Sequence, residues 1–157
     1  MKFMMPAATA AMLFAWASPA GAMSPHIGLN TQMFVEQVAT DINGRERRML
    51  RNADRVQPGD RLIFVMDWRN EAREPLNRPS LTRAVPAGTR PDLGDPRMLV
   101  SVDGGRRWGR IEQLWLPTPL GGVRRALPED VTHVRWQLPE SVPPGESGRI
   151  SYRAVVR

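Results

Sequence analysis

The chain has 157 residues, no cysteine and a formal net charge of +6. The absence of cysteine excludes a disulfide framework and thiol catalysis. Lys2 is the only lysine, so the remaining basic charge belongs to arginine, and a basic surface favours anionic partners.

Residues 1–22 have the pattern of a secretory signal peptide. Lys2 provides the positive start, a mostly apolar stretch follows, and small residues stand at Ala20 and Ala22. The apolar stretch is short for a membrane span, so we expect cleavage after Ala22 rather than an uncleaved membrane anchor. Residues 23–157 then form a single domain. We expect it to be a monomer, periplasmic or secreted, with no transmembrane span after cleavage.

The rest of the chain alternates between strand-length segments and turns. Residues 24–31 are expected to be irregular. Asn43-Gly44 separates segments 33–42 and 45–51 and favours a hairpin with a type I′ turn, in which both central residues take positive φ. Further turns are predicted at 58–60, 86–88, 103–105 and 143–146. The remaining predicted strands are 61–69, 79–85, 98–102, 106–110, 111–116, 131–138 and 149–157.

Alternation with a period of two separates the inward side chains from the outward ones. The predicted core residues are Leu62, Phe64, Met66, Trp68, Met98, Val100, Val102, Val134, Trp136, Leu138, Ile150, Tyr152, Ala154 and Val156. No amphipathic helix is predicted, and prolines and glycines recur at strand-length intervals. The pattern predicts an all-β, immunoglobulin-like antiparallel sandwich of about seven to nine strands.

Five motifs occur in one order: Pro58-Gly59-Asp60, Trp68-Arg69-Asn70, Val85-Pro86-Ala87-Gly88-Thr89, Val100-Ser101-Val102-Asp103-Gly104-Gly105 and Pro144-Gly145-Glu146. Together they resemble the immunoglobulin-like conserved repeat domain of bacterial exported and surface proteins, a domain of unknown function, over residues 33–156. The resemblance implies a seven-stranded sandwich with a structural or adhesive role and no catalytic residues. A single copy, with Ile63, Val65 and Asp67 where the family repeats threonine, departs from the family pattern and argues against a spacer role.

Residues with catalytic or metal-binding chemistry are sparse. His26 and His133 are far apart, and no serine lies in a nucleophile elbow. We therefore predict no catalytic residues, no metal and no cofactor. A weak calcium site in the loops, at Asp92 and Asp95 or at Glu129 and Asp130, stays open as an alternative, although such residues also favour turns for backbone reasons.

The candidate interaction surface consists of arginines and one tryptophan: Arg45, Arg47, Arg106, Arg107, Trp115, Arg124 and Arg125. Arginine can bind phosphate or carboxylate groups in a bidentate manner, but a solvated, charge-protected sheet edge also explains the arginines. We expect Trp115 to be buried beneath the 117–128 loop; if it is exposed, it marks the best partner site.

These observations predict a non-enzymatic module with a structural or binding role in the cell envelope. Its partner would be an envelope protein or an anionic polysaccharide. Nucleic acid is not expected, because no stacking aromatics lie among the arginines. The alternative is an envelope enzyme or small-ligand-binding protein with a site in loops 70–78 and 117–130.

Overall fold

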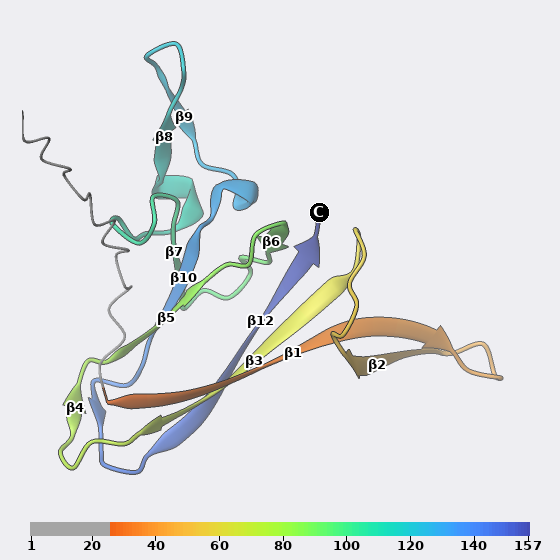
Figure 1. Cartoon of the computed structure of the whole chain (residues 1–157), viewed down its shortest axis with the longest axis horizontal. Helices are drawn as coiled ribbons and strands as arrows, with labels where there is room; N and C mark the ends of the chain where they lie inside the picture. The colour runs from red at the N-terminus through yellow and green to blue at the C-terminus, as the bar shows by residue number, and fades with distance from the viewer. Residues whose placement is uncertain (1–25) are drawn as a thin grey trace, which may run out of the picture.

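Two antiparallel sheets face each other across one core in the computed structural model, which describes residues 26–157 (Figure 1). The larger sheet has the strand order β2-β1-β3-β12-β6 and the smaller sheet the order β5-β10-β7. The strands of the larger sheet are β1 (Ile27–Thr40), β2 (Glu46–Asn52), β3 (Arg61–Asn70), β6 (Thr89–Pro91) and β12 (Ser147–Val156). Those of the smaller sheet are β5 (Ser80–Ala84), β7 (Met98–Ser101) and β10 (His133–Gln137).

Two short strand pairs and two 3-10 turns complete the described part of the chain. The strand pairs are β4 (Leu76–Asn77) with β11 (Ser141–Val142), and β8 (Trp115–Pro117) with β9 (Val123–Arg125). The 3-10 turns are η1 (Ile111–Gln113) and η2 (Pro128–Asp130). The predicted all-β sandwich is therefore confirmed, with more and shorter strands than expected. Between residues 26 and 157, no helix is long and apolar enough to cross a bilayer.

β3 is the central strand of the larger sheet, and its alternation determines which face is buried. Leu62, Phe64, Met66 and Trp68 are buried, as predicted. β1 and β12 pair with β3 on either side along most of its length. The face that carries Arg61, Ile63 and Val65 is consequently the outer face of this sheet.

Aromatic side chains join the two layers. Phe64 and Tyr152, which are register partners on β3 and β12, stack with their ring centroids 4.7 Å apart. Trp136 of β10 in the facing sheet lies 5.5 Å from the Tyr152 ring. Burial raises the pKa of Tyr152 to about 12. The inward assignment of these three residues is confirmed.

Four predictions about secondary structure are wrong. Residues 24–31 were expected to be irregular, but β1 begins at Ile27, because Ile27 and Leu29 continue the inward alternation and pair opposite Asn70 and Trp68. Residues 106–110 form a loop rather than a strand, apart from an isolated bridge between Gly109 and Val100. Residues 111–113 turn as η1 instead of extending a strand through 111–116, and residues 123–125, expected in a loop, form β9.

The β1–β2 hairpin was predicted correctly, but its turn was not. The loop spans Ile42, Asn43 and Gly44, and of these only Gly44 has a positive φ, +76°. A type I′ turn needs a positive φ at two central residues. The hairpin therefore has a three-residue loop with glycine at the bulge position, in which Gly44 is the residue that must tolerate left-handed backbone.

Candidate binding surfaces

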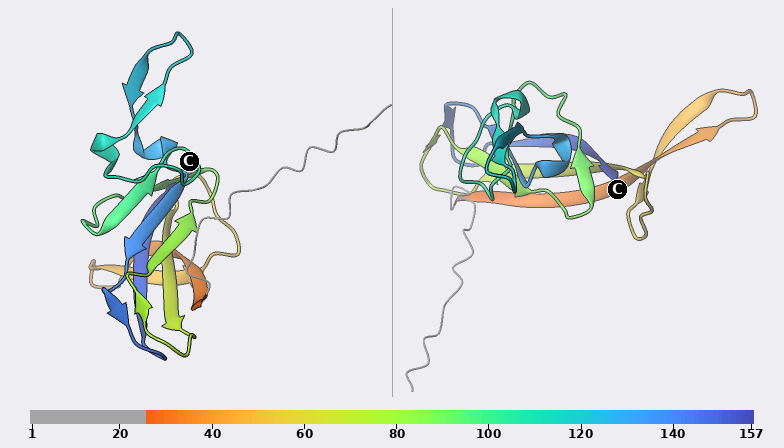
Figure 2. Two further views of the ribbon diagram at one scale, coloured as in Figure 1. Left: turned by 90° about the vertical axis from the view of Figure 1, so that its left-hand side faces the viewer. Right: turned by 90° about the horizontal axis from the view of Figure 1, so that it is seen from above.

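The β1–β2 hairpin extends past the end of β3 and projects from the sandwich (Figures 1 and 2). β3 begins at Arg61, opposite Glu36, so residues of β1 beyond Glu36 pair only with β2. We call residues 37–50 the arm. A two-stranded ribbon is marginally stable on its own in water, so a second surface packed against the arm would stabilise it.

Both faces of the arm are exposed, and both carry apolar side chains. Val38 and Leu50 lie on one face, Met49 lies on the other, and Ile42 is fully exposed at the tip. A concentration of exposed apolar residues on one projecting element is typical of a surface that binds a partner.

The turn at the tip determines which backbone groups of β2 point outward. The N–H of Asp41 donates to the C=O of Arg45 (2.8 Å), and the N–H of Gly44 donates to the C=O of Asp41 (2.9 Å). Hydrogen-bonded and non-hydrogen-bonded pairs alternate along an antiparallel ladder. With the register of β1 and β2, the residues that direct N–H and C=O away from β1 are Glu46, Arg48, Leu50 and Asn52.

The structure places Arg45 at the end of this turn and Arg47 in β2. The Arg47 Nε donates to Asp41 Oδ2 at 3.3 Å. Asp41 also accepts the N–H groups of Arg45 and Asn43, and the bond from Arg45, above all, lowers the pKa of the Asp41 carboxyl. Arg47 therefore contributes to the rigidity of the tip as well as to its charge.

The β8–β9 hairpin is a second projection and holds three of the predicted surface residues. Trp115 is 46 % exposed, so the expectation that it is buried is wrong: the 117–122 loop extends beyond Trp115 instead of folding over it. The Arg125 guanidinium lies 5.5 Å from the Trp115 ring centroid. Arg124 donates two hydrogen bonds to Asp130, at 2.6 and 2.7 Å, and these bonds lower the pKa of Asp130.

Arg106 and Arg107 lie elsewhere, in a loop organised by Asp103. The Asp103 carboxylate accepts the backbone N–H groups of both arginines, the Arg107 Nε–H and the Ser101 hydroxyl. Burial alone raises the pKa of Asp103, but these hydrogen bonds outweigh it and hold the pKa well below its usual range. The surface predicted as one set is thus divided among three places: the arm, the β8–β9 hairpin and this loop.

The loop after β7 places a serine and an aspartate near a histidine, since Ser101 is the register partner of His133. Ser101 is fully buried, and its hydroxyl donates to Asp103 and accepts the N–H of Gly105. His133 contacts the Thr132 hydroxyl and the edge of Trp108, not Ser101. These hydrogen bonds make Ser101 an anchor of the loop. Its hydroxyl has no hydrogen bond to His133, the histidine that would have to act as a general base.

The two loops of the alternative site lie at opposite ends of the molecule. Loop 70–78 adjoins β4, whereas residues 117–130 form the β8–β9 hairpin and η2 (Figures 1 and 2). Buried Asn70 organises the first loop: its side-chain amide donates to the C=O of Val142 (2.8 Å) and its oxygen accepts the N–H of Ala72. The structure does not bring these loops together into one site.

The carboxylates considered for calcium already have partners within the chain. Asp92 accepts the N–H of Gly94, and Asp95 accepts bonds from Arg97 and from the Trp136 indole. Glu129 pairs with Arg90 at 3.3 Å, and Asp130 pairs with Arg124. No group of three potential metal ligands occurs within residues 26–157.

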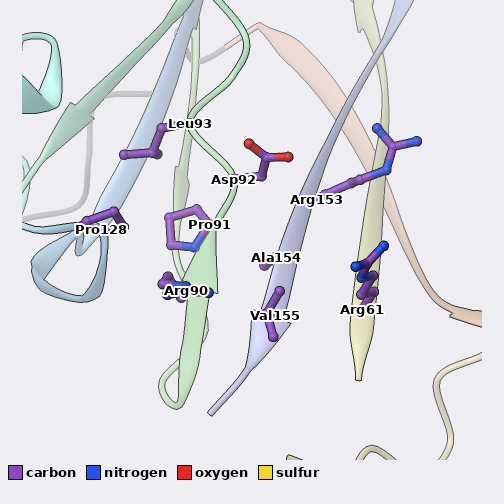
Figure 3. A pocket seen from close by; sticks show the side chains of 9 residues that line it. All are labelled: Arg61, Arg90, Pro91, Asp92, Leu93, Pro128, Arg153, Ala154 and Val155. Atoms are coloured by element: carbon purple, nitrogen blue, oxygen red, sulfur yellow. The ribbon is translucent and has the colours of Figure 1, made fainter. Parts of the chain in front are cut away.

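A groove of about 460 Å³ lies over strands β3, β12 and β6 (Figure 3). Arg61 and Arg153 line one side, and Leu93 and Pro128 line the other. Sequence reasoning did not identify this groove, because its residues come from distant segments and no local motif links them.

Comparisons of the chain with protein-family models, with curated proteins and with solved structures find no match. The resemblance to the conserved repeat domain therefore stays a prediction based on the motifs of residues 33–156.

Proposed function

We propose that this chain is a non-enzymatic, exported β-sandwich module that binds a protein of the cell envelope. The partner contributes a strand that pairs with the outer edge of β2. The observation that carries this proposal is the arm, a ribbon whose two faces and outer edge are open to solvent.

The free edge of β2 suits a polypeptide strand better than a ligand that lacks a peptide backbone. Glu46, Arg48, Leu50 and Asn52 offer alternating N–H and C=O groups, which an added strand can pair with in sequence. Exposed Leu50 and Met49 supply apolar contacts on either face. Backbone pairing gives affinity, and the side chains on the two faces give specificity.

Charge favours an acidic partner over a second copy of the chain. Residues 45–52 contain four arginines and one glutamate. Edge-to-edge pairing of two copies would set these arginines against one another, and like charges on adjacent strands are destabilising. Arg47 pairs with Asp41 and Arg48 with Glu36, so a strand that carries aspartate or glutamate would pair first with Arg45 and Arg51.

The location in the envelope is supported by the pattern of residues 1–22, which lie outside the residues that the structure describes. An exported module without cysteine needs no disulfide for folding, since its core of buried apolar residues spans both sheets. A binding role is consistent with this context.

A pair of substitutions at Arg48 tests the proposal. Arg48→Pro removes an outward N–H and inserts a ring at the free edge, whereas Arg48→Gln keeps the N–H; both lose the same guanidinium. A photo-crosslinker placed at Leu50 in each variant is used to capture the partner from envelope extract. We expect Arg48→Gln to retain a crosslinked protein and Arg48→Pro to lose it, with affinity for the purified partner reduced by about tenfold or more.

Three outcomes would overturn strand addition. The first is equal capture by the two variants. The second is a crosslink between two copies of the chain. The third is binding to anionic polysaccharide that disappears with added salt in both variants, because salt screens exposed charges. Matched circular dichroism spectra of the two variants confirm that the proline leaves the sandwich folded.

A further inference from the structure

The groove over β3, β12 and β6 concentrates positive charge on the outer face of the larger sheet. Val155 is the register partner of Arg61 on one side and of Arg90 on the other. Arg153 lies two residues before Val155 and shares its face. Adjacent strands are about 4.8 Å apart, so the backbones of Arg61 and Arg90 lie about 10 Å apart, with Arg153 next to both.

Two of these three arginines, Arg61 and Arg153, have no ion pair within residues 26–157. Arg90 pairs with Glu129 at 3.3 Å. The ion pairs and side-chain hydrogen bonds within residues 26–157 include neither Arg61 nor Arg153. Asp92 is the one carboxylate that lines the groove, and one of its oxygens accepts the N–H of Gly94 at 3.0 Å.

Like charges on neighbouring strands destabilise a sheet, so a bound anion would reduce the repulsion between Arg61 and Arg153. Guanidinium groups bind phosphate and carboxylate oxygens in pairs, through parallel N–H donors. In Figure 3, the side chains of Arg153 and Arg61 extend from neighbouring strands on one side of the groove.

The remaining surface of the groove is apolar. Leu93, Pro128 and Val155 are half-buried, whereas Pro91 and Ala154 are buried register partners that face the core. Leu93 and Pro128 lie across from Arg61 and Arg153 (Figure 3). The volume, about 460 Å³, is within the range of small-molecule sites, about 300–1,000 Å³.

We propose that this groove binds a small organic anion, in which a phosphate or carboxylate is attached to an apolar group. The anionic group lies against Arg61 and Arg153, and the apolar group lies over Leu93 and Pro128. This site goes beyond the proposed function, because none of its residues belongs to the arm and its ligand is not a polypeptide strand.

Titrations monitored by backbone amide NMR shifts test the proposal with three probes at constant ionic strength. Phenyl phosphate has both the anionic and the apolar part, inorganic phosphate lacks the ring, and benzyl alcohol lacks the charge. We expect phenyl phosphate to shift the amides of Asp92, Leu93 and Val155 saturably, with an affinity about tenfold above that of either other probe.

Substitutions then assign the binding to the arginines. Arg153→Gln and Arg61→Gln should each weaken phenyl phosphate binding by about tenfold, the effect of losing a charge-assisted hydrogen bond. Arg149→Gln is the matched control, since Arg149 is on the same strand and face as Arg153 but pairs with Asp67 at 2.6 Å. It should change the affinity less than about twofold.

The proposal is overturned if phenyl phosphate causes no saturable shifts, if Arg149→Gln weakens binding as much as Arg153→Gln, or if inorganic phosphate binds as tightly as phenyl phosphate. The last result would indicate charge attraction without an apolar site. Arg48→Pro, which alters only the arm, should bind phenyl phosphate normally, so failure of strand addition and failure of this site are separate outcomes.

Discussion

At the scale of single residues, Trp136 is the best test of the two-layer core. Its side chain is 1 % exposed and lies between the two sheets, next to Tyr152. Trp136→Ala should lower the free energy of unfolding by about 3–5 kcal/mol, since it leaves a large cavity. Urea denaturation measures the change.

Trp115→Ala is the control for this measurement, because Trp115 is half-exposed on the β8–β9 hairpin. Its effect should be less than about 1 kcal/mol, as for other surface positions. A similar loss at both tryptophans would mean that the hairpin packs against the core in solution.

The hydrogen bonds of Asp103 should affect how the stability of the protein depends on pH under acidic conditions. The hydrogen bonds that hold the pKa of Asp103 below its usual range stabilise the folded state above the unfolded pKa, about 3.9. This contribution declines as the pH falls below about 4 toward the folded pKa. Thermal unfolding of the wild type should thus show a steeper loss of stability below pH 4 than that of Asp103→Asn.

Other carboxylates, such as Asp95 and Asp130, also have a lowered pKa and remain in Asp103→Asn. The wild type and the variant must therefore be compared at each pH rather than judged from one acid midpoint. Parallel curves would show that Asp103 contributes nothing specific to acid stability.

At the scale of elements, the arm should be dispensable for folding. Every residue of β2 is exposed, whereas Val35, at the base of the arm, is 1 % exposed. Replacing residues 36–50 with Asn-Gly joins Val35 to its register partner Arg51 through a favourable two-residue turn. The free energy of unfolding should change by less than about 1 kcal/mol in urea titrations.

The shortened chain should also lose affinity for the purified partner, while it retains phenyl phosphate binding in the groove. A large loss of stability would instead show that the arm packs on the sandwich in solution. That result would contradict the inference that the exposed surface of the arm binds a partner.

At the scale of the whole molecule, local patterns predict the central strands well. In β3, β10 and β12 the inward face was readable from alternation alone, because one face of each strand is buried and the other is not. At residues 106–110 the prediction of a strand was wrong, because side-chain hydrogen bonds rather than alternation determine the backbone there. Asp103 holds residues 104–107 in a loop by hydrogen bonds to the backbone, although their sequence follows a hairpin-like turn.

The binding surfaces were less predictable, because they depend on register between distant segments. The arm projects because β3 begins opposite Glu36, and nothing within residues 33–51 specifies this. The groove likewise depends on Arg61, Arg90 and Val155 falling in one row across three strands. Leu114 and Leu116 flank Trp115 with apolar residues, so alternation could not show that the tryptophan is half-exposed.

The continuity of β1 has a mechanical consequence. This strand runs without interruption from the tip of the arm to Ile27, and it pairs with β3 from Ile27 to Glu36. A partner that pulls on the arm along the axis of β1 therefore loads all of these backbone hydrogen bonds together, in shear, instead of peeling them apart one at a time. The arm would then transmit force directly into the most extensively paired part of the sandwich, and attachment there would resist sudden rupture.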